Sequence, residues 1–289
     1  MTLDKKHLLT SKQMASFVAK GFLRFDELIP KALNERIMRE IDAGQVKAAP
    51  AATPLSQCYA GTAVREMLDM PEVQGLIQSL VGPDPLFDHQ AVHVRQPREG
   101  AAQGMHGDSI IDTRMHFDIQ LMYFPHDVPL EMGGTLVVPG SHFRRINEMD
   151  IARYQNLLGQ VPMTCKAGTL LALHHGIWHC GRRNQTDSVR YMFKVRLNPR
   201  VRQLRLWNTD DLTSDTTKNK AIFTSDTNAV DDVQTILGRQ EPWFEDASGR
   251  LEIVNRIKMW RFLTGDQTFD VHYWLTRIEN MPENLTLSA

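Results

Sequence analysis

Three side chains that could hold a metal ion are spread over two short segments of the sequence. His106 and Asp108 stand two residues apart in GMHGDSI, and His179 lies far downstream in GIWHCGRRNQ. Two imidazoles and one carboxylate form the facial triad that binds Fe(II) and leaves coordination positions open. Arg190, eleven residues after His179, adds a two-pronged donor suited to a carboxylate. Together these residues predict a non-haem iron site that also binds a carboxylate ligand.

The His-x-Asp spacing occurs a second time, at His116 and Asp118. That second pair opens a stretch with the alternating pattern of a strand, which favours a structural role. The first pair lies among glycines, which indicate a loop edge where side chains can converge on an ion. We therefore expect the first pair to supply the ligands and keep the second as the alternative.

The pattern of apolar residues divides the chain into three parts. Residues 1–85 show mainly helical spacing, for example in SKQMASFVAK, which ends at Gly21, and in residues 71–81. Residues 86–200 change to short strands separated by glycine and proline turns, which is typical of a sandwich or barrel. We expect a single domain in which these strands form the catalytic core.

Helical spacing returns in the third part, residues 201–289. RLEIVNRIKMWRFLTG and DVHYWLTRIEN have the pattern of two amphipathic helices with aromatic anchors. Their tryptophans, with Trp243 and Trp178, are expected to pack helices onto the β core. The alternative roles for this C-terminal helical extension are a lid and a homodimer contact.

Composition excludes several classes of protein. The 289 residues contain 33 Lys and Arg against 34 Asp and Glu, so no excess of positive charge indicates nucleic acid or an anionic membrane as a partner. No apolar run is long enough to span a bilayer, and the first residues lack the apolar segment of a signal peptide. Three cysteines make a disulfide framework improbable on number alone, so we expect a cytoplasmic protein.

Two longer segments resemble the phytanoyl-CoA dioxygenase family. DIQLMYFPHDVPLEMGGTLVVPGSHF is similar to the family's strand, acidic turn, glycine pair and strand ending in PGSH. KAGTLLALHHGIWHCGRRNQTDSVRYMF is similar to its next block, in which an arginine follows the histidine by eleven residues. The resemblance covers roughly residues 12–198. It implies a mainly β fold with flanking helices, built on a double-stranded β-helix (jelly-roll, cupin-like) core.

The resemblance also implies an activity and roles for individual residues. Fe(II) would be held by His106, Asp108 and His179, and 2-oxoglutarate and O₂ would be co-substrates. Arg190 would pair with the far carboxylate of 2-oxoglutarate. Tyr123 falls where a residue lining the co-substrate is expected, and Arg95 falls where the family frequently has a lysine. Gly107 departs from the family's usual glutamine within the His-x-Asp motif.

The strand that begins near Arg190 raises a question about substrate charge. Because side chains alternate along a strand, Met192, Lys194 and Arg196 share the face of Arg190. If Arg190 points toward the iron, the two further cations point into the barrel as well. Buried charges need partners, and two solutions remain open. One is an anionic group of the substrate, and the other is pairing with Asp or Glu of neighbouring strands or extension to the rim.

The sequence therefore predicts an Fe(II)- and 2-oxoglutarate-dependent oxygenase that oxidises a small organic molecule. The presence of Asp108 favours hydroxylation over halogenation, since related halogenases replace this carboxylate by a small residue. Two alternatives remain. One is a cupin-like metalloenzyme that does not use 2-oxoglutarate, and the other is a non-catalytic binding protein on the same fold.

Overall fold

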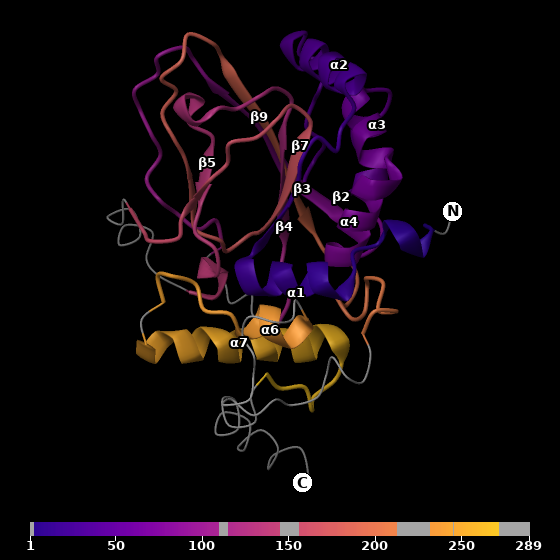
Figure 1. Cartoon of the computed structure of the whole chain (residues 1–289). Coiled ribbons are helices and arrows are strands. Elements are labelled where there is room, and N and C mark those ends of the chain that lie inside the picture. The colour runs from indigo at the N-terminus through magenta and orange to yellow at the C-terminus, as the bar shows by residue number, and fades with distance from the viewer. Residues whose placement is uncertain (1–2, 110–114, 145–155, 213–231, 245, 272–289) are drawn as a thin grey trace.

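The computed structural model describes residues 3–109, 115–144, 156–212, 232–244 and 246–271. A sheet of six strands and a sheet of three strands form the centre of this part of the chain. Helices from the first third of the sequence flank the larger sheet, and the C-terminal helices lie beneath it next to α1 (Figure 1). This arrangement confirms the predicted mainly β core with flanking helices.

The N-terminal helices follow the sequence signals closely. Helix α1 (Ser11–Lys20) begins with a capping box between Thr10 and Gln13, and it ends at Gly21, whose φ of 79° favours glycine. The other helices before the core are α2 (Lys31–Asp42), α3 (Ala63–Asp69) and α4 (Pro71–Val81). Short 3₁₀ helices cover Lys5–His7, Leu55–Gln57, Leu130–Met132 and Ser141–Phe143. Among these four α-helices only α3 was not predicted from the sequence, and the 3₁₀ helices were not predicted either.

The larger sheet is antiparallel in the order β1-β7-β4-β9-β3-β2. Its strands are β1 (Phe22–Phe25), β2 (Thr53–Pro54), β3 (Leu86–Arg95), β4 (Ile119–Phe124), β7 (Thr169–His174) and β9 (Arg190–Asn198). Strand β1 pairs with β7, and β2 pairs with β3. The β core therefore begins earlier in the chain than the predicted boundary at residue 86.

The smaller sheet has the order β6-β5-β8 and faces the larger one. It consists of β5 (Thr135–Val137), β6 (Val161–Pro162) and β8 (His179–Gly181). Met122 and Leu171 of the larger sheet and Val137 of the smaller sheet belong to one buried cluster. Strand β8, which carries His179, thus belongs to the second sheet.

The larger sheet has one face for the helices and one for the interior. On β9, Phe193, Val195 and Leu197 belong to the hydrophobic cluster formed with α1, α3 and α4. Arg190 and Met192 lie on the opposite face. The predicted alternation of this strand is confirmed, and the interior between the sheets is where the polar side chains meet.

The C-terminal part packs onto α1. Helix α6 (Val233–Gly238) and helix α7 (Asp246–Thr264) both contact α1, and Trp260 of α7 packs against Trp207 at a tilt of 41°, with ring centroids 5.5 Å apart. Trp243 stacks on Trp178 at 5.7 Å, behind the smaller sheet. These contacts confirm the packing role of these aromatic residues. The helix predicted in DVHYWLTRIEN lies almost entirely outside the described residues.

None of the helices in the described part of the chain is long and apolar enough to cross a bilayer.

Candidate metal centre

The two segments that carry the predicted ligands lie side by side. The His106 amide donates to the His179 carbonyl at 3.0 Å, and the His179 amide donates to the His106 carbonyl at 2.8 Å. A Cβ atom on Gly107 would lie 3.2 Å from the Gly176 carbonyl oxygen, which is a tighter contact than most Cβ atoms make. The glycine within the His-x-Asp motif therefore fits the close approach of these two segments.

His106, Asp108 and His179 form one cluster whose ligand atoms all lie within 4.8 Å of one another. The Asp108 carboxylate oxygens lie 3.8 Å from His106 Nε2 and 3.6 Å from His179 Nε2. Each ring directs Nδ1 at a backbone carbonyl, His106 at Gly104 (2.8 Å) and His179 at Ile177 (3.0 Å). With Nδ1 as the donor, the lone pair of each ring is on Nε2, which faces Asp108.

The charge states of the cluster also suit a cation. Burial lowers the pKa of His179 to about 4, so its ring is neutral at pH 7. Burial opposes ionisation of Asp108, but His179, Lys194 and His106 outweigh it and lower the pKa of Asp108 to about 2. Imidazole nitrogens together with a carboxylate are the donor set that Fe(II) accepts in a facial triad. The residues present therefore fit the metal that the sequence predicts.

The second His-x-Asp pair does not join this cluster. Among the described residues, the metal-binding group contains His106, Asp108 and His179 and no others. The His116 side chain is exposed, and Asp118 accepts a 2.6 Å hydrogen bond from the Arg196 guanidinium. The first pair is the one whose geometry suits ligands.

Arg190 lines the cavity beside the triad, together with Met192, Lys194 and residues of the neighbouring strands. Arg190 is 4% exposed. One nitrogen of its guanidinium donates to the carbonyl oxygens of Met132 and Arg182, at 3.2 Å each. No carboxylate in the described part of the chain forms an ion pair with it. Burial lowers the pKa of Arg190 to about 10, which keeps it cationic at pH 7.

Arg95 lies directly across from Arg190 in the pairing of β3 with β9, and it lines the same cavity. Its guanidinium forms an ion pair with Glu99. The neighbouring positive charge of Arg95 also contributes to the lowered pKa of Arg190. Arg95 is thus near the expected co-substrate position, but its own charge is already balanced.

Tyr123 does not lie where the resemblance places it. Because side chains alternate along β4, Tyr123 faces the helices, while Met122 lines the cavity. The Tyr123 hydroxyl donates to the Asn34 side chain of α2, and the residue is 1% exposed. Tyr123 is therefore a core residue in this structure and does not reach the triad.

Several side chains of the site did not stand out in the sequence. Gln120 donates to Asp108 Oδ2 and is fully buried. His93 lies across from Met192 and lines the cavity, as do Gln103 and Thr135. Side chains alternate along β4 and β3. Gln120 and His93 could therefore have been assigned to the inner face if the sequence had shown which face of each strand points inward. Nothing local in the sequence distinguishes Gln103 or Thr135.

Acidification is expected to lower the free energy of unfolding in the presence of a chelator. Burial lowers the pKa of His93, His175 and His179 to about 4 each, below the usual value near 6.5. Between these values the unfolded chain binds protons that the folded chain does not. Stability is therefore full above about pH 6.5 and is lost as the pH falls toward 4. Calorimetric melting at stepwise pH should show a decrease of several degrees.

The control for this pH dependence is His175→Gln, which removes one buried imidazole outside the triad. Its melting temperature should fall less steeply between pH 6.5 and 4 than that of the wild type. Equal slopes would mean that His175 does not contribute.

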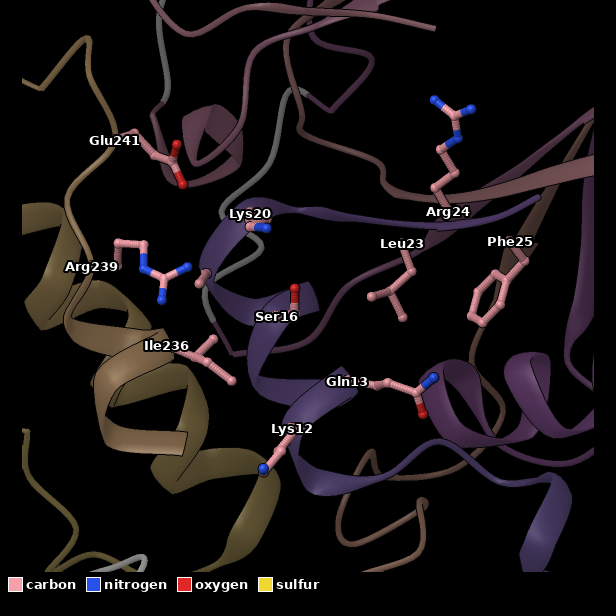
Figure 2. A pocket seen from close by; sticks show the side chains of 11 residues that line it. Lys12, Gln13, Ser16, Lys20, Leu23, Arg24, Phe25, Ile236, Arg239 and Glu241 are labelled. Carbon is pink, nitrogen blue, oxygen red and sulfur yellow. The ribbon is translucent and has the colours of Figure 1, made fainter. Parts of the chain in front are cut away.

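A second hollow, of about 320 Å³, lies between α1, β1 and α6 (Figure 2). Lys12, Lys20 and Arg239 border it, with Leu23 and Ile236 among its apolar walls. No histidine lines this hollow, and its only carboxylate is that of Glu241. Within the described part of the chain, the metal-binding donor set lies in the cavity between the sheets.

Solved structures with this fold include several non-haem iron proteins. HygX from Streptomyces hygroscopicus, with nickel and 2-oxoglutarate bound, is 16% identical and has a TM-score of 0.54, with 72% of this chain and 93% of HygX covered. SnoK, a non-haem α-ketoglutarate-dependent carbocyclase from nogalamycin biosynthesis, is 16% identical with a TM-score of 0.53, covering 68% of this chain and 87% of SnoK. The non-haem monooxygenase ThoJ, as a nickel complex, is 22% identical with a TM-score of 0.50, covering 64% and 76%.

No curated protein sequence matches the chain. The model of the phytanoyl-CoA dioxygenase family matches residues 17–192, which is more than half of the sequence and includes the triad and Arg190. The chain therefore belongs to the phytanoyl-CoA dioxygenase family and is a non-haem iron, 2-oxoglutarate-dependent enzyme.

Proposed function

We propose that the protein hydroxylates a small organic molecule with one oxygen atom of O₂, while the other oxygen atom enters succinate as 2-oxoglutarate loses CO₂. His106, Asp108 and His179 would hold Fe(II) through two Nε2 atoms and a carboxylate oxygen. When bound, the iron and 2-oxoglutarate supply the oxidising chemistry, and the protein supplies orientation and a site shielded from water. The carboxylate of Asp108 favours hydroxylation over halogenation.

The observation that carries this proposal is the buried Arg190 guanidinium beside the triad. It donates to backbone carbonyls, and no carboxylate of the described residues lies within ion-pair distance of it, since Glu99, whose charge acts on Arg190, is paired with Arg95. A buried charge without a counter-ion is costly, and a guanidinium fits a carboxylate with two parallel hydrogen bonds. We infer that the distal carboxylate of 2-oxoglutarate completes this pairing, with Arg95 nearby.

The same observation weighs against the two alternatives. A cupin-like metalloenzyme that does not use 2-oxoglutarate has no need for a buried arginine next to its metal. A binding protein that has lost catalysis has no need to keep the triad and the arginine together. The pairing of both features in one cavity favours the 2-oxoglutarate-dependent reaction.

An anaerobic titration tests the proposal. Addition of 2-oxoglutarate to the Fe(II)-loaded protein under argon should produce a weak visible charge-transfer band. Addition of O₂ should then yield succinate, which is measured directly. A protein that binds Fe(II) but shows no band is a metalloenzyme of another kind, and a protein that shows the band but never forms succinate is a binding protein.

Two further proposals concern the state of the protein in the cell. We propose that it acts in the cytoplasm and that its C-terminal helices contribute to a homodimer. Most apolar side chains of α7 are buried within the chain, whereas Leu251 on the same helix is 53% exposed. Sedimentation equilibrium of the wild type and of Leu251→Glu tests this contact. A monomeric wild type would contradict it.

A further inference from the structure

Lys194 is a cation inside the cavity, and among the described residues its only acidic partner is a proposed iron ligand. Its ammonium lies 3.6 Å from Asp108 Oδ2, and its side chain is 12% exposed. No other carboxylate in the described part of the chain lies within ion-pair distance of it. Asp108 Oδ2 also accepts a hydrogen bond from Gln120 and lies 3.6 Å from His179 Nε2. Lys194 therefore competes for an oxygen that a metal would use.

The neighbouring cation on the same face of β9 is different. Arg196 lies 2.6 Å from Asp118 and 3.3 Å from Asp88, two carboxylates that belong to no metal cluster. The sequence allowed these cations to pair either with carboxylates of neighbouring segments or with an anionic substrate. Arg196 pairs with such carboxylates and needs no substrate. Lys194 lacks a carboxylate of this kind among the described residues.

Metal binding would leave the Lys194 charge without a partner. A divalent cation on Asp108 would stand a few ångströms from the ammonium, so like charges would repel within a buried site. The open volume at the triad is about 30 Å³, far below the roughly 300 Å³ or more of a typical ligand pocket. Entry of any organic ligand therefore requires flexible side chains to move, and lysine has a mobile four-carbon stem.

We propose that Lys194 binds a carboxylate group of a ligand next to the metal. In this arrangement the ammonium turns from Asp108 to the ligand when the metal takes the aspartate oxygens. Arg190 and Lys194 enter the cavity about 13 Å apart along β9, as four residues of a strand require, so they hold different groups. The carboxylate at Lys194 belongs either to the metal-binding end of 2-oxoglutarate or to the molecule that is oxidised. This inference rests on the proposed function.

The first arm of the test measures 2-oxoglutarate. Calorimetric titration of 2-oxoglutarate into Mn(II)-loaded protein is compared for the wild type, Lys194→Met and Lys194→Arg. If the carboxylate is that of the co-substrate, Lys194→Met should bind it about tenfold more weakly, which is typical of the loss of one charge-assisted hydrogen bond. Lys194→Arg should retain most of the affinity.

The second arm asks for a carboxylate on the other molecule. With Mn(II) bound and 2-oxoglutarate saturating, the proton NMR lines of acetate and acetamide are broadened according to their access to the paramagnetic ion. If the carboxylate belongs to the oxidised molecule, the wild type should broaden acetate several-fold more than acetamide. Lys194→Met should lose this preference, and Lys194→Arg should keep it.

A charge-matched control is Lys12→Met on α1, since Lys12 is exposed and remote from the triad cavity. It should behave as the wild type in both arms, and melting curves should verify the fold of each variant. If the wild type binds Mn(II) and 2-oxoglutarate, and Lys194→Met keeps both its 2-oxoglutarate affinity and any preference for acetate, the role of Lys194 is overturned. The proposed function would then still stand. A wild type that binds no 2-oxoglutarate would overturn the proposed function as well.

Discussion

Asp108→Ala is expected to abolish 2-oxoglutarate turnover and to weaken binding of Fe(II) or Mn(II) by at least about a hundredfold. Loss of a residue that merely orients a metal ligand typically reduces metal affinity by about 10–100-fold, so the loss of a ligand itself should exceed that. The Asp108 side chain is 24% exposed, and its removal opens no large cavity in the apolar core. The protein should therefore remain folded, as circular dichroism and melting curves would show.

The matched control is His116→Ala, which alters the second His-x-Asp pair. Its ring is exposed and lies outside the ligand cluster, so metal affinity and succinate formation should stay near those of the wild type. Loss of turnover in His116→Ala together with normal turnover in Asp108→Ala would show that the wrong pair has been assigned.

Arg190→Lys is expected to weaken 2-oxoglutarate binding by about tenfold or more, because lysine cannot form the second parallel hydrogen bond. A charge-assisted hydrogen bond is worth roughly 1.5–3 kcal/mol. Arg190→Met, which removes the charge entirely, should have the larger effect. The KM for 2-oxoglutarate should rise more than kcat falls, since the contact is distant from the atoms that react. Succinate formation at varied 2-oxoglutarate concentration measures both quantities.

Arg98→Lys serves as the control for Arg190. Arg98 forms an exposed ion pair with Asp187, and it does not line the cavity. Its substitution should leave the affinity for 2-oxoglutarate unchanged. An unchanged affinity in Arg190→Lys would instead mean that another cation, such as Arg95, holds the distal carboxylate.

The sequence by itself determined most of the secondary structure and the identity of the central residues. The capping box before α1 and the glycine after it are local signals, and local hydrogen bonds enforce them in the structure. The period of two along β9 follows from strand geometry alone, so it correctly grouped Arg190 with Met192 and Lys194. The residue types and spacing of the triad and the arginine predicted a site that the fold does assemble.

The tertiary structure decided which face each group of alternating residues uses. Alternation places Tyr123 and Met122 on opposite faces of β4, but it does not say which face meets the helices. The pairing of β4 with β7 and β9, and the packing of α2, turn Tyr123 toward Asn34 and Met122 toward the triad. A resemblance read along the sequence could not supply that choice.

Long-range pairing also decided the partners of the charges. Strand β8 pairs with β5, and its His179 also forms a bridge to His106, far upstream in the chain. No local pattern encodes either meeting. The same holds for Arg196, which pairs with Asp118 and Asp88, and for Lys194, which pairs with Asp108 and with no other carboxylate of the described residues. Sequence patterns fix which side chains point together along one strand. Only the assembled sheets bring together the side chains of different strands, because those contacts depend on register and on how the two sheets face each other.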